Sequence, residues 1–253
     1  MRQKIELIVF RAYAHLRSEA ERTYIGILWW ILDPIIFMLI FYVVFALLLQ
    51  RHTNDFVSFL LVGLVVWRWF QNTVAPGSAS IMFGKSLMNQ VYLPKIIFPL
   101  VSIIADLFKF SLVFLLLLIY LWIRGYSPSW PYLALPLVLI LQFTLIIGTT
   151  LVAAAFVPML PDLRNVISHL LSLMLYLSGI FYDGTTIPER FRTYYYLNPM
   201  ANLIEAYRAI LLNGQWPEWQ ALFYVGLTGA VLTLLGYKLI AHFDHQYPNM
   251  ALS

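Results

Sequence analysis

The sequence predicts an all-α integral membrane protein with six transmembrane helices. Of the 253 residues, 61% are hydrophobic and only 11% are charged, whereas soluble domains are roughly half apolar and about a quarter charged. The apolar residues also gather in stretches of about 20 residues, the length that a helix needs to cross a bilayer. The chain has no cysteine, which excludes disulfide scaffolds, cysteine-ligated zinc, iron–sulfur centres and thiol nucleophiles.

An amphipathic helix is expected first, over residues 1–22. Apolar residues recur there at helical spacing, at Ile5, Ile8, Val9, Ala12 and Leu16. This pattern predicts a helix that lies on the inner leaflet, and periodicity alone leaves open whether it is an anchor or a docking surface. Arg11 interrupts the apolar residues after Lys4, so no cleavable signal peptide is expected.

Six apolar stretches with few charges follow. The predicted spans are residues 25–49, 56–75, 96–123, 131–157, 166–182 and 219–240. Two polar segments between them are longer than turns: the loop 76–95, and residues 183–218, which we call the gate loop. Two short helices are expected in the gate loop, one after Pro188 and one ending at Asn213, with the break at Asn198-Pro199.

The distribution of Lys and Arg predicts the orientation. Six spans put both termini on one side, and nine basic residues fall on that side: Arg2, Lys4, Arg11, Arg17, Arg22, Lys85, Lys95, Arg164 and Lys238. Five fall opposite: Arg51, Arg124, Arg190, Arg192 and Arg208. Because basic loops stay in the cytoplasm, we expect cytoplasmic termini and an external gate loop.

No enzymatic site stands out. Residues 79–86 match a loose phosphate-binding loop, but that loop works between a β-strand and a helix, and this stretch follows a span. The 12 acidic residues are scattered, and there is no serine elbow. His242, Asp244 and His245 are too few for a clear metal site. We expect no metal or cofactor on this chain and, without a basic face, no nucleic-acid partner.

Three charged residues fall inside predicted spans: Arg68, Asp106 and Lys109. An ionisable group in lipid persists when it is paired or functional. At about 1.5 Å per residue, Arg68 and Asp106 lie at similar depth, and Asp106 and Lys109 are i, i+3 neighbours. The pattern favours a structural ion pair between adjacent helices over a proton-coupling site. We therefore expect Asp106→Asn to lower stability or assembly.

Aromatic residues gather near both ends of the spans, which is typical of interfacial belts. Sugar rings also present C–H faces that stack on aromatic rings, so an aromatic-lined channel would pass a glycan. The candidates for such a path flank the first external turn and the second span: Tyr42, Phe45, Phe56, Phe59 and Trp67.

Five motifs occur in order along the chain: Arg22–Pro34, Tyr92–Pro99, Pro161–Arg164, Leu177–Tyr182 and Tyr196–Arg208. Together they resemble the permease subunits of polysaccharide-exporting ABC transporters, the exporters of O-antigen, capsule and teichoic acid. The sequence departs from this family at Gly179, where many relatives have proline. It also lacks the repeated basic residues that often precede the first span.

The resemblance implies a half-transporter in the bacterial inner membrane. Two copies of this chain would form the pathway, and two copies of a separate ATPase subunit would bind ATP and Mg²⁺. Residues 81–93 would form a coupling helix, and the implied ATPase contacts are Phe83, Lys85, Met88, Asn89, Tyr92, Arg11 and Arg17. The gate loop would narrow the exit, with gate candidates Tyr195, Asn198, Pro199, Glu205 and Arg208.

The expected function is therefore export of a polyprenyl-pyrophosphate-linked polysaccharide of the O-antigen or capsule type. The lipid head would enter between protomers, and the basic N-terminal helix would contact membrane lipids or the pyrophosphate. Two alternatives stay open. The same architecture exports drugs or glycolipids, and a membrane-embedded glycosyl or lipid-phosphate transferase is the alternative of another class.

Overall fold

The computed structural model describes residues 2–21, 26–41, 43–44, 55–84, 88 and 93–247. Within these ranges every regular secondary-structure element is a helix. The longer helices are α1 (Arg2–Glu21), α2 (Trp29–Phe41), α3 (Phe56–Phe83), α5 (Ile97–Ile123), α6 (Leu135–Phe156), α7 (Leu163–Leu177), α8 (Glu189–Tyr196), α9 (Pro199–Leu211) and α10 (Trp219–Phe243). Single turns precede three of them: η1 (Gly26–Leu28), η3 (Trp130–Ala134) and η4 (Gly184–Thr186).

Several helices in the described ranges are long and apolar enough to cross a membrane. Four helical segments combine enough length with enough apolar character to cross a bilayer: Phe56–Phe83, Ile97–Ile123, Trp130–Phe156 and Trp219–Phe243. Leu163–Leu177 is apolar but shorter. Of the first predicted span, residues 26–41 and 43–44 are described and include η1 and α2. In its described ranges the chain is thus an all-helical integral membrane protein.

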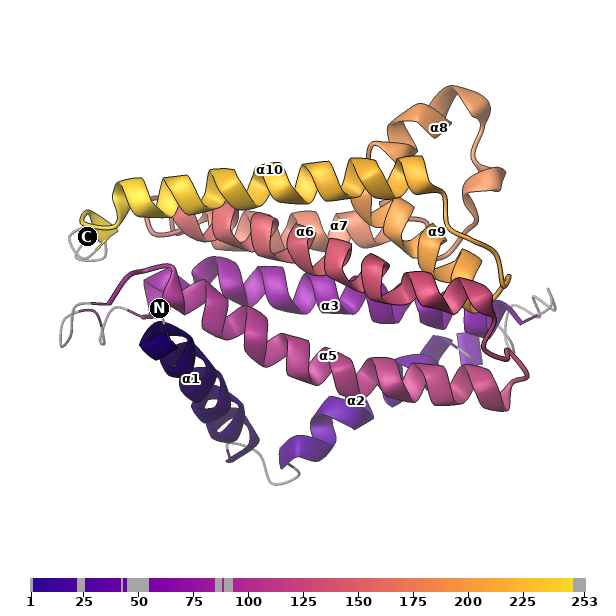
Figure 1. Cartoon of the computed structure of the whole chain (residues 1–253), viewed down its shortest axis with the longest axis horizontal. Helices are drawn as coiled ribbons and strands as arrows, with labels where there is room; N and C mark the ends of the chain where they lie inside the picture. Colours follow the sequence, from indigo (N-terminus) through magenta and orange to yellow (C-terminus); the bar gives the residue numbers. More distant parts are fainter. Residues whose placement is uncertain are drawn as a thin grey trace.

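The long helices run side by side as a bundle (Figure 1). Both ends of the chain lie at one end of this bundle, and α8 and α9 lie at the other. The N-terminal helix α1 crosses obliquely beside α5 instead of joining the bundle. Residues 2–21 thus form the predicted N-terminal helix, and the gate loop contains the two predicted short helices, α8 and α9.

Two predicted boundaries need correction. The loop 76–95 was expected to begin at Pro76, but α3 continues through Pro76 to Phe83. Residues past the proline, including Gly77 and Ile81, are buried, so tertiary packing outweighs the backbone hydrogen bond that proline removes. At the fifth span, α7 ends at Leu177 instead of residue 182, because Gly179 takes φ +71° and turns the chain out of the helix.

Helices α6 and α10 pack closely along their length (Figure 1). Their contact uses glycine, as helix pairs in membranes often do. A Cβ built on Gly236 would lie 2.8 Å from the backbone nitrogen of Val152, and one built on Gly229 would lie 3.0 Å from the backbone nitrogen of Leu145. The two backbones therefore approach each other at a distance that only a residue without a side chain allows.

The core lies around α3, whose long buried stretch contacts α5, α6, α7 and α9. Trp69 stacks on Phe110 of α5 with ring centroids 3.9 Å apart. At the centre, the Gln142 side chain on α6 donates to the carbonyl of Val66, at 2.9 Å, and accepts from the hydroxyl of Tyr207, at 2.8 Å. This buried amide fixes the rotation of α3, α6 and α9 relative to one another, because a misplaced helix would leave it unpaired.

Candidate functional site

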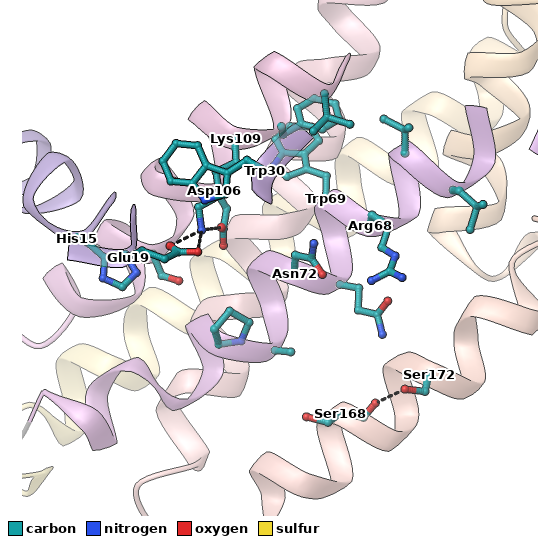
Figure 2. Close-up of a pocket in the computed structure, with 18 of the residues that line it drawn as sticks. His15, Glu19, Trp30, Arg68, Trp69, Asn72, Asp106, Lys109, Ser168 and Ser172 are labelled. Carbon is teal, nitrogen blue, oxygen red and sulfur yellow. Dashed lines mark hydrogen bonds and ion pairs between the residues drawn. The ribbon is translucent and has the colours of Figure 1, made fainter. Parts of the chain in front are cut away.

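A cavity of about 790 Å³ lies between α1, α2, α3, α5 and α7 (Figure 2). One part of its wall is apolar and includes Leu61, Leu64 and Val113. The rest carries polar and charged side chains: His15, Ser18, Glu19, Arg68, Gln71, Asn72, Ser102, Asp106, Lys109, Ser168 and Ser172. A mixed wall of this kind suits a ligand that is both hydrated and partly apolar.

Lys109 is the centre of the charges in this cavity. Its Nζ lies 2.6 Å from Oε2 of Glu19 on α1 and 3.3 Å from Oδ1 of Asp106 on its own helix. The same Nζ lies 5.6 Å from the ring centroid of Trp30 on α2, within cation–π range. One ammonium group therefore links α1, α2 and α5, and Figure 2 shows the two carboxylates converging on it.

Arg68 lies on another part of the same wall. The sequence places Arg68 and Asp106 at similar depth, and both do line the cavity. In Figure 2, however, the guanidinium group of Arg68 turns away from Asp106, toward the side where Ser168 and Ser172 of α7 lie. The ion pair at Asp106 is made with Lys109. The three charges thus share one cavity, and Asp106 pairs with its i, i+3 neighbour Lys109, which also pairs with Glu19.

At the other end of the bundle, Arg208 of α9 is buried and holds the gate loop against the helices. Its Nη1 and Nη2 donate to the carbonyls of Gly179 and Ile180, at 2.7 and 2.9 Å, and its Nε donates to the carbonyl of Phe59, at 3.2 Å. The guanidinium carbon also lies 3.4 Å from the ring centroid of Phe59. Burial lowers the pKa of Arg208 to about 10, so the group stays charged at neutral pH.

The remaining gate candidates surround Arg208. Asn198 caps α9, accepting from the backbone nitrogen of Met200 at 3.0 Å, and its Nδ2 donates to the Ser178 hydroxyl at 2.8 Å. Pro199 is the first residue of the helix, where its missing N–H is harmless. Tyr195 is buried beside Gly179. Burial raises the pKa of Glu205, whose carboxylate accepts a 3.4 Å hydrogen bond from the Tyr196 hydroxyl.

Two of the coupling candidates, Phe83 and Met88, are described at or just after the end of α3. Phe83 is 64% exposed at the end of α3, with the Arg164 guanidinium 5.1 Å from its ring centroid, and Met88 is buried. Lys85, Asn89 and Tyr92 lie outside the described residues.

On α1, Arg17 is exposed and bonded to Glu21 at 2.7 Å, and Arg11 is half-buried. An ion pair that was not predicted from the sequence joins the turn before α5 to the residue after α10. Lys95 donates its backbone N–H to Oδ1 of Asp244, at 2.9 Å, and its Nζ lies 3.7 Å from Oδ2.

The aromatic candidates for a glycan path separate into three groups. Phe56 and Phe59 stack with centroids 6.0 Å apart at the start of α3, beside the Arg208 anchor. Trp67 is only 1% exposed and packs in the core of the chain, so its ring is covered by the chain's own helices. Tyr42 and Phe45 lie outside the described residues.

Sequence reasoning missed Glu19 and Trp30, which complete the Lys109 site. Glu19 is separated from Lys109 by 90 positions, and the acid lies on a helix expected to rest at the membrane surface. A lysine inside a predicted span was the available signal, because such a group requires a counter-charge. The sequence does not say which distant acid supplies it.

These features define a class of protein: a helical membrane protein with a charged cavity among its helices and, at the far end of the bundle, a loop held in place by a buried arginine. The model of the ABC-2 type transporter family matches residues 14–212. The chain belongs to this family of membrane proteins.

Several characterised relatives align over most of their length. The O-antigen export system permease protein RfbA of Myxococcus xanthus is 27% identical over 228 residues, 89% of this chain and 88% of that protein. A protein of the same name from Klebsiella pneumoniae is 24% identical and covers 96% of this chain and 93% of its own length. The polysialic acid transport protein KpsM of Escherichia coli is 26% identical, covering 88% of each.

Proposed function

We propose that this protein is the permease half of an ATP-driven exporter that moves a polyprenyl-pyrophosphate-linked polysaccharide across the bacterial inner membrane. The observation that carries the proposal is the alignment, over 88% or more of both chains, with permeases named for O-antigen and polysialic acid transport. The cavity at Lys109 supports it, since a charged, partly apolar space inside a bundle suits a lipid-linked glycan. The drug and glycolipid alternatives gain no support from these relatives.

In this proposal, energy comes from a separate ATPase subunit. The stretch that matches a phosphate-binding loop begins inside α3, since Ala79 to Phe83 are helical. What leads into it is the helix from Phe56 onward, whereas such a loop needs a β-strand before it. The terminal end of the bundle would be cytoplasmic and would receive the ATPase at Phe83 and the neighbouring coupling segment. Two chains and two ATPase subunits would form the transporter, and ATP binding and hydrolysis would drive alternation between its states.

Co-purification tests the partnership. The tagged chain expressed in its host is expected to bring down an ABC ATPase, and the complex to hydrolyse ATP while the chain alone does not. Phe83→Ala removes an exposed ring from the docking end, and loss of one interface anchor should lower recovery of the ATPase by about fivefold or more. Phe223→Ala is the control, because Phe223 is also an exposed phenylalanine but lies near the start of α10. ATP hydrolysis by the isolated chain would contradict the proposal.

A further inference from the structure

A second cavity, of about 330 Å³, lies at the gate end of the bundle. Its wall is formed by η4, α8, α9, the start of α10 and the loop between α9 and α10, with Phe59 of α3 at one side. Small-molecule sites have volumes from about 300 Å³ upward, so this space has the size of a site for one small ligand. It is separate from the cavity at Lys109, with which it shares no lining residue.

The polar wall of this second cavity includes several side chains whose carboxylate or carboxamide oxygens accept hydrogen bonds, together with a single guanidinium group. Three carboxylates line it, those of Asp183, Glu205 and Glu218. Asn202 adds a carboxamide that is 4% exposed and is oriented by its 2.8 Å hydrogen bond to the carbonyl of Tyr196. Acceptors in this number match a ligand that carries many O–H donors.

Arg208 also lines the cavity, but its positive charge does not offset the three carboxylates from the viewpoint of a bound ligand. Arg208 directs its guanidinium donors to three backbone carbonyls, those of Phe59, Gly179 and Ile180. An anionic ligand would therefore meet three carboxylates and a guanidinium group whose three nitrogens each already donate to a backbone carbonyl, which selects against it. A neutral ligand is not repelled by the carboxylates.

An aromatic ring completes the wall. Trp216, on the loop between α9 and α10, is 51% exposed, and its ring lies 6.1 Å from that of Trp219 between centroids. The neighbouring tryptophan supports the ring from outside the cavity lining. A half-exposed indole beside hydrogen-bond acceptors offers an apolar face with a polar surround, which matches a pyranose ring with its C–H face and its hydroxyl edge.

We propose that this gate cavity is a binding subsite for a neutral sugar residue of the exported glycan. Trp216 stacks on the sugar ring, and Glu205 and Asn202 accept hydrogen bonds from its hydroxyls. The identification of the sugar as cargo rests on the proposed export function. The binding itself is a property of this cavity that can be measured without transport.

The test uses the full chain in lipid nanodiscs. The probes are neutral tetrasaccharides of glucose, galactose and mannose, with tetragalacturonate as the acidic counterpart, and binding is followed by saturation-transfer difference NMR. At least one neutral probe is expected to bind, and tetragalacturonate to bind about tenfold more weakly or not at all. Glu205→Gln and Trp216→Ala should each weaken the neutral probe by about five- to tenfold.

Trp130→Ala is the matched control, because Trp130 is an exposed tryptophan outside this cavity and its variant should bind like the wild type. Thermal unfolding of each variant shows whether it has folded. Absence of binding by every neutral probe, equal binding by the variants and the wild type, or tighter binding of tetragalacturonate would overturn the inference. Host cells that lack this chain yet display normal surface glycan would instead overturn the export function, whatever the binding shows.

Discussion

Replacing Lys109 with methionine probes the charge cluster that links α1, α2 and α5. The substitution keeps an unbranched apolar chain of similar length and removes the ammonium group from between two carboxylates. Asp106 would then be left with its side chain only 13% exposed, and Glu19 with its side chain 41% exposed. Without the ammonium group that both now contact, the carboxylates of Asp106 and Glu19 would repel each other.

The magnitude follows from the geometry. At separations of 2.6 and 3.3 Å, the Coulomb attractions are about 6 and about 5 kcal/mol with an effective dielectric constant of about 20. Desolvation offsets most of this gain, and removing one partner of a buried pair typically costs about 3–5 kcal/mol. Because Glu19 is partly exposed and can be hydrated, we expect Lys109→Met to lower the free energy of unfolding by about 3 kcal/mol, the low end of that range.

Three companion variants separate the contributions of the two ion pairs that Lys109 makes. Asp106→Asn leaves the Lys109–Glu19 pair intact, so it should cost only about 1 kcal/mol. The double variant, Lys109→Met with Asp106→Asn, removes the stranded buried carboxylate and should be more stable than Lys109→Met alone. Lys238→Met, at an exposed lysine on α10, should leave stability unchanged.

Steric trapping in bicelles measures these free energies, with Tm in detergent as a second readout. The reasoning would be refuted if Lys109→Met matched the wild type, or if the double variant were less stable than the single one. Normal stability of Asp106→Asn combined with loss of export would point instead to a direct role of this carboxylate in transport.

Three further variants test the rest of the fold. Arg208→Lys keeps the charge but loses the planar fork that reaches three carbonyls. The free energy of unfolding should fall by about 2 kcal/mol, and Tm should fall with it; an unchanged Tm would mean that Arg208 does not anchor the gate loop. Gly236→Ala meets backbone of α6 and should destabilise the chain, whereas Gly226→Ala meets only the end of the Leu141 side chain and should be tolerated; equal effects would contradict the close α6–α10 approach. Although burial opposes it, hydrogen bonds from Ser58, Arg124 and Tyr126 lower the pKa of Asp55 below its ordinary 3.8. The deprotonated form thus stabilises the fold, and the stability advantage over Asp55→Asn, below about 1 kcal/mol at an exposed pair, should persist above pH 3.8 and vanish as the pH falls through the lower folded pKa. An advantage that grew with acidification would refute this assignment.

The helices were predictable because their signals are local. Apolar length alone located α3, α5, α6 and α10, and the Asn198-Pro199 pair placed the start of α9 correctly. The errors came where packing decides. The helix α3 continues past Pro76 because Gly77 and Ile81 are buried, and no local pattern shows what will cover a residue.

The side-chain contacts within the sites were harder to predict than the helices. A span that is apolar on every side has no stripe to show which face points inward, so depth could be counted along the sequence but rotation could not. Arg68 and Asp106 therefore seemed suited to pair, while the structure brings Glu19 to Lys109 from the N-terminal helix. Arg208 was a predicted gate candidate, but two of its three carbonyl partners lie in the turn after α7, and the sequence does not show where that turn packs.

The central claim, export of a lipid-linked polysaccharide, is tested most directly by deleting the gene in its host and locating the polymer. Spheroplasts of the deletion strain are probed with an antibody against the surface glycan before and after lysis. We predict that the strain lacks surface glycan, accumulates lipid-linked polymer that is detected only after lysis, and recovers when the intact chain is restored. A deletion strain with normal surface glycan and no internal polymer would contradict the account.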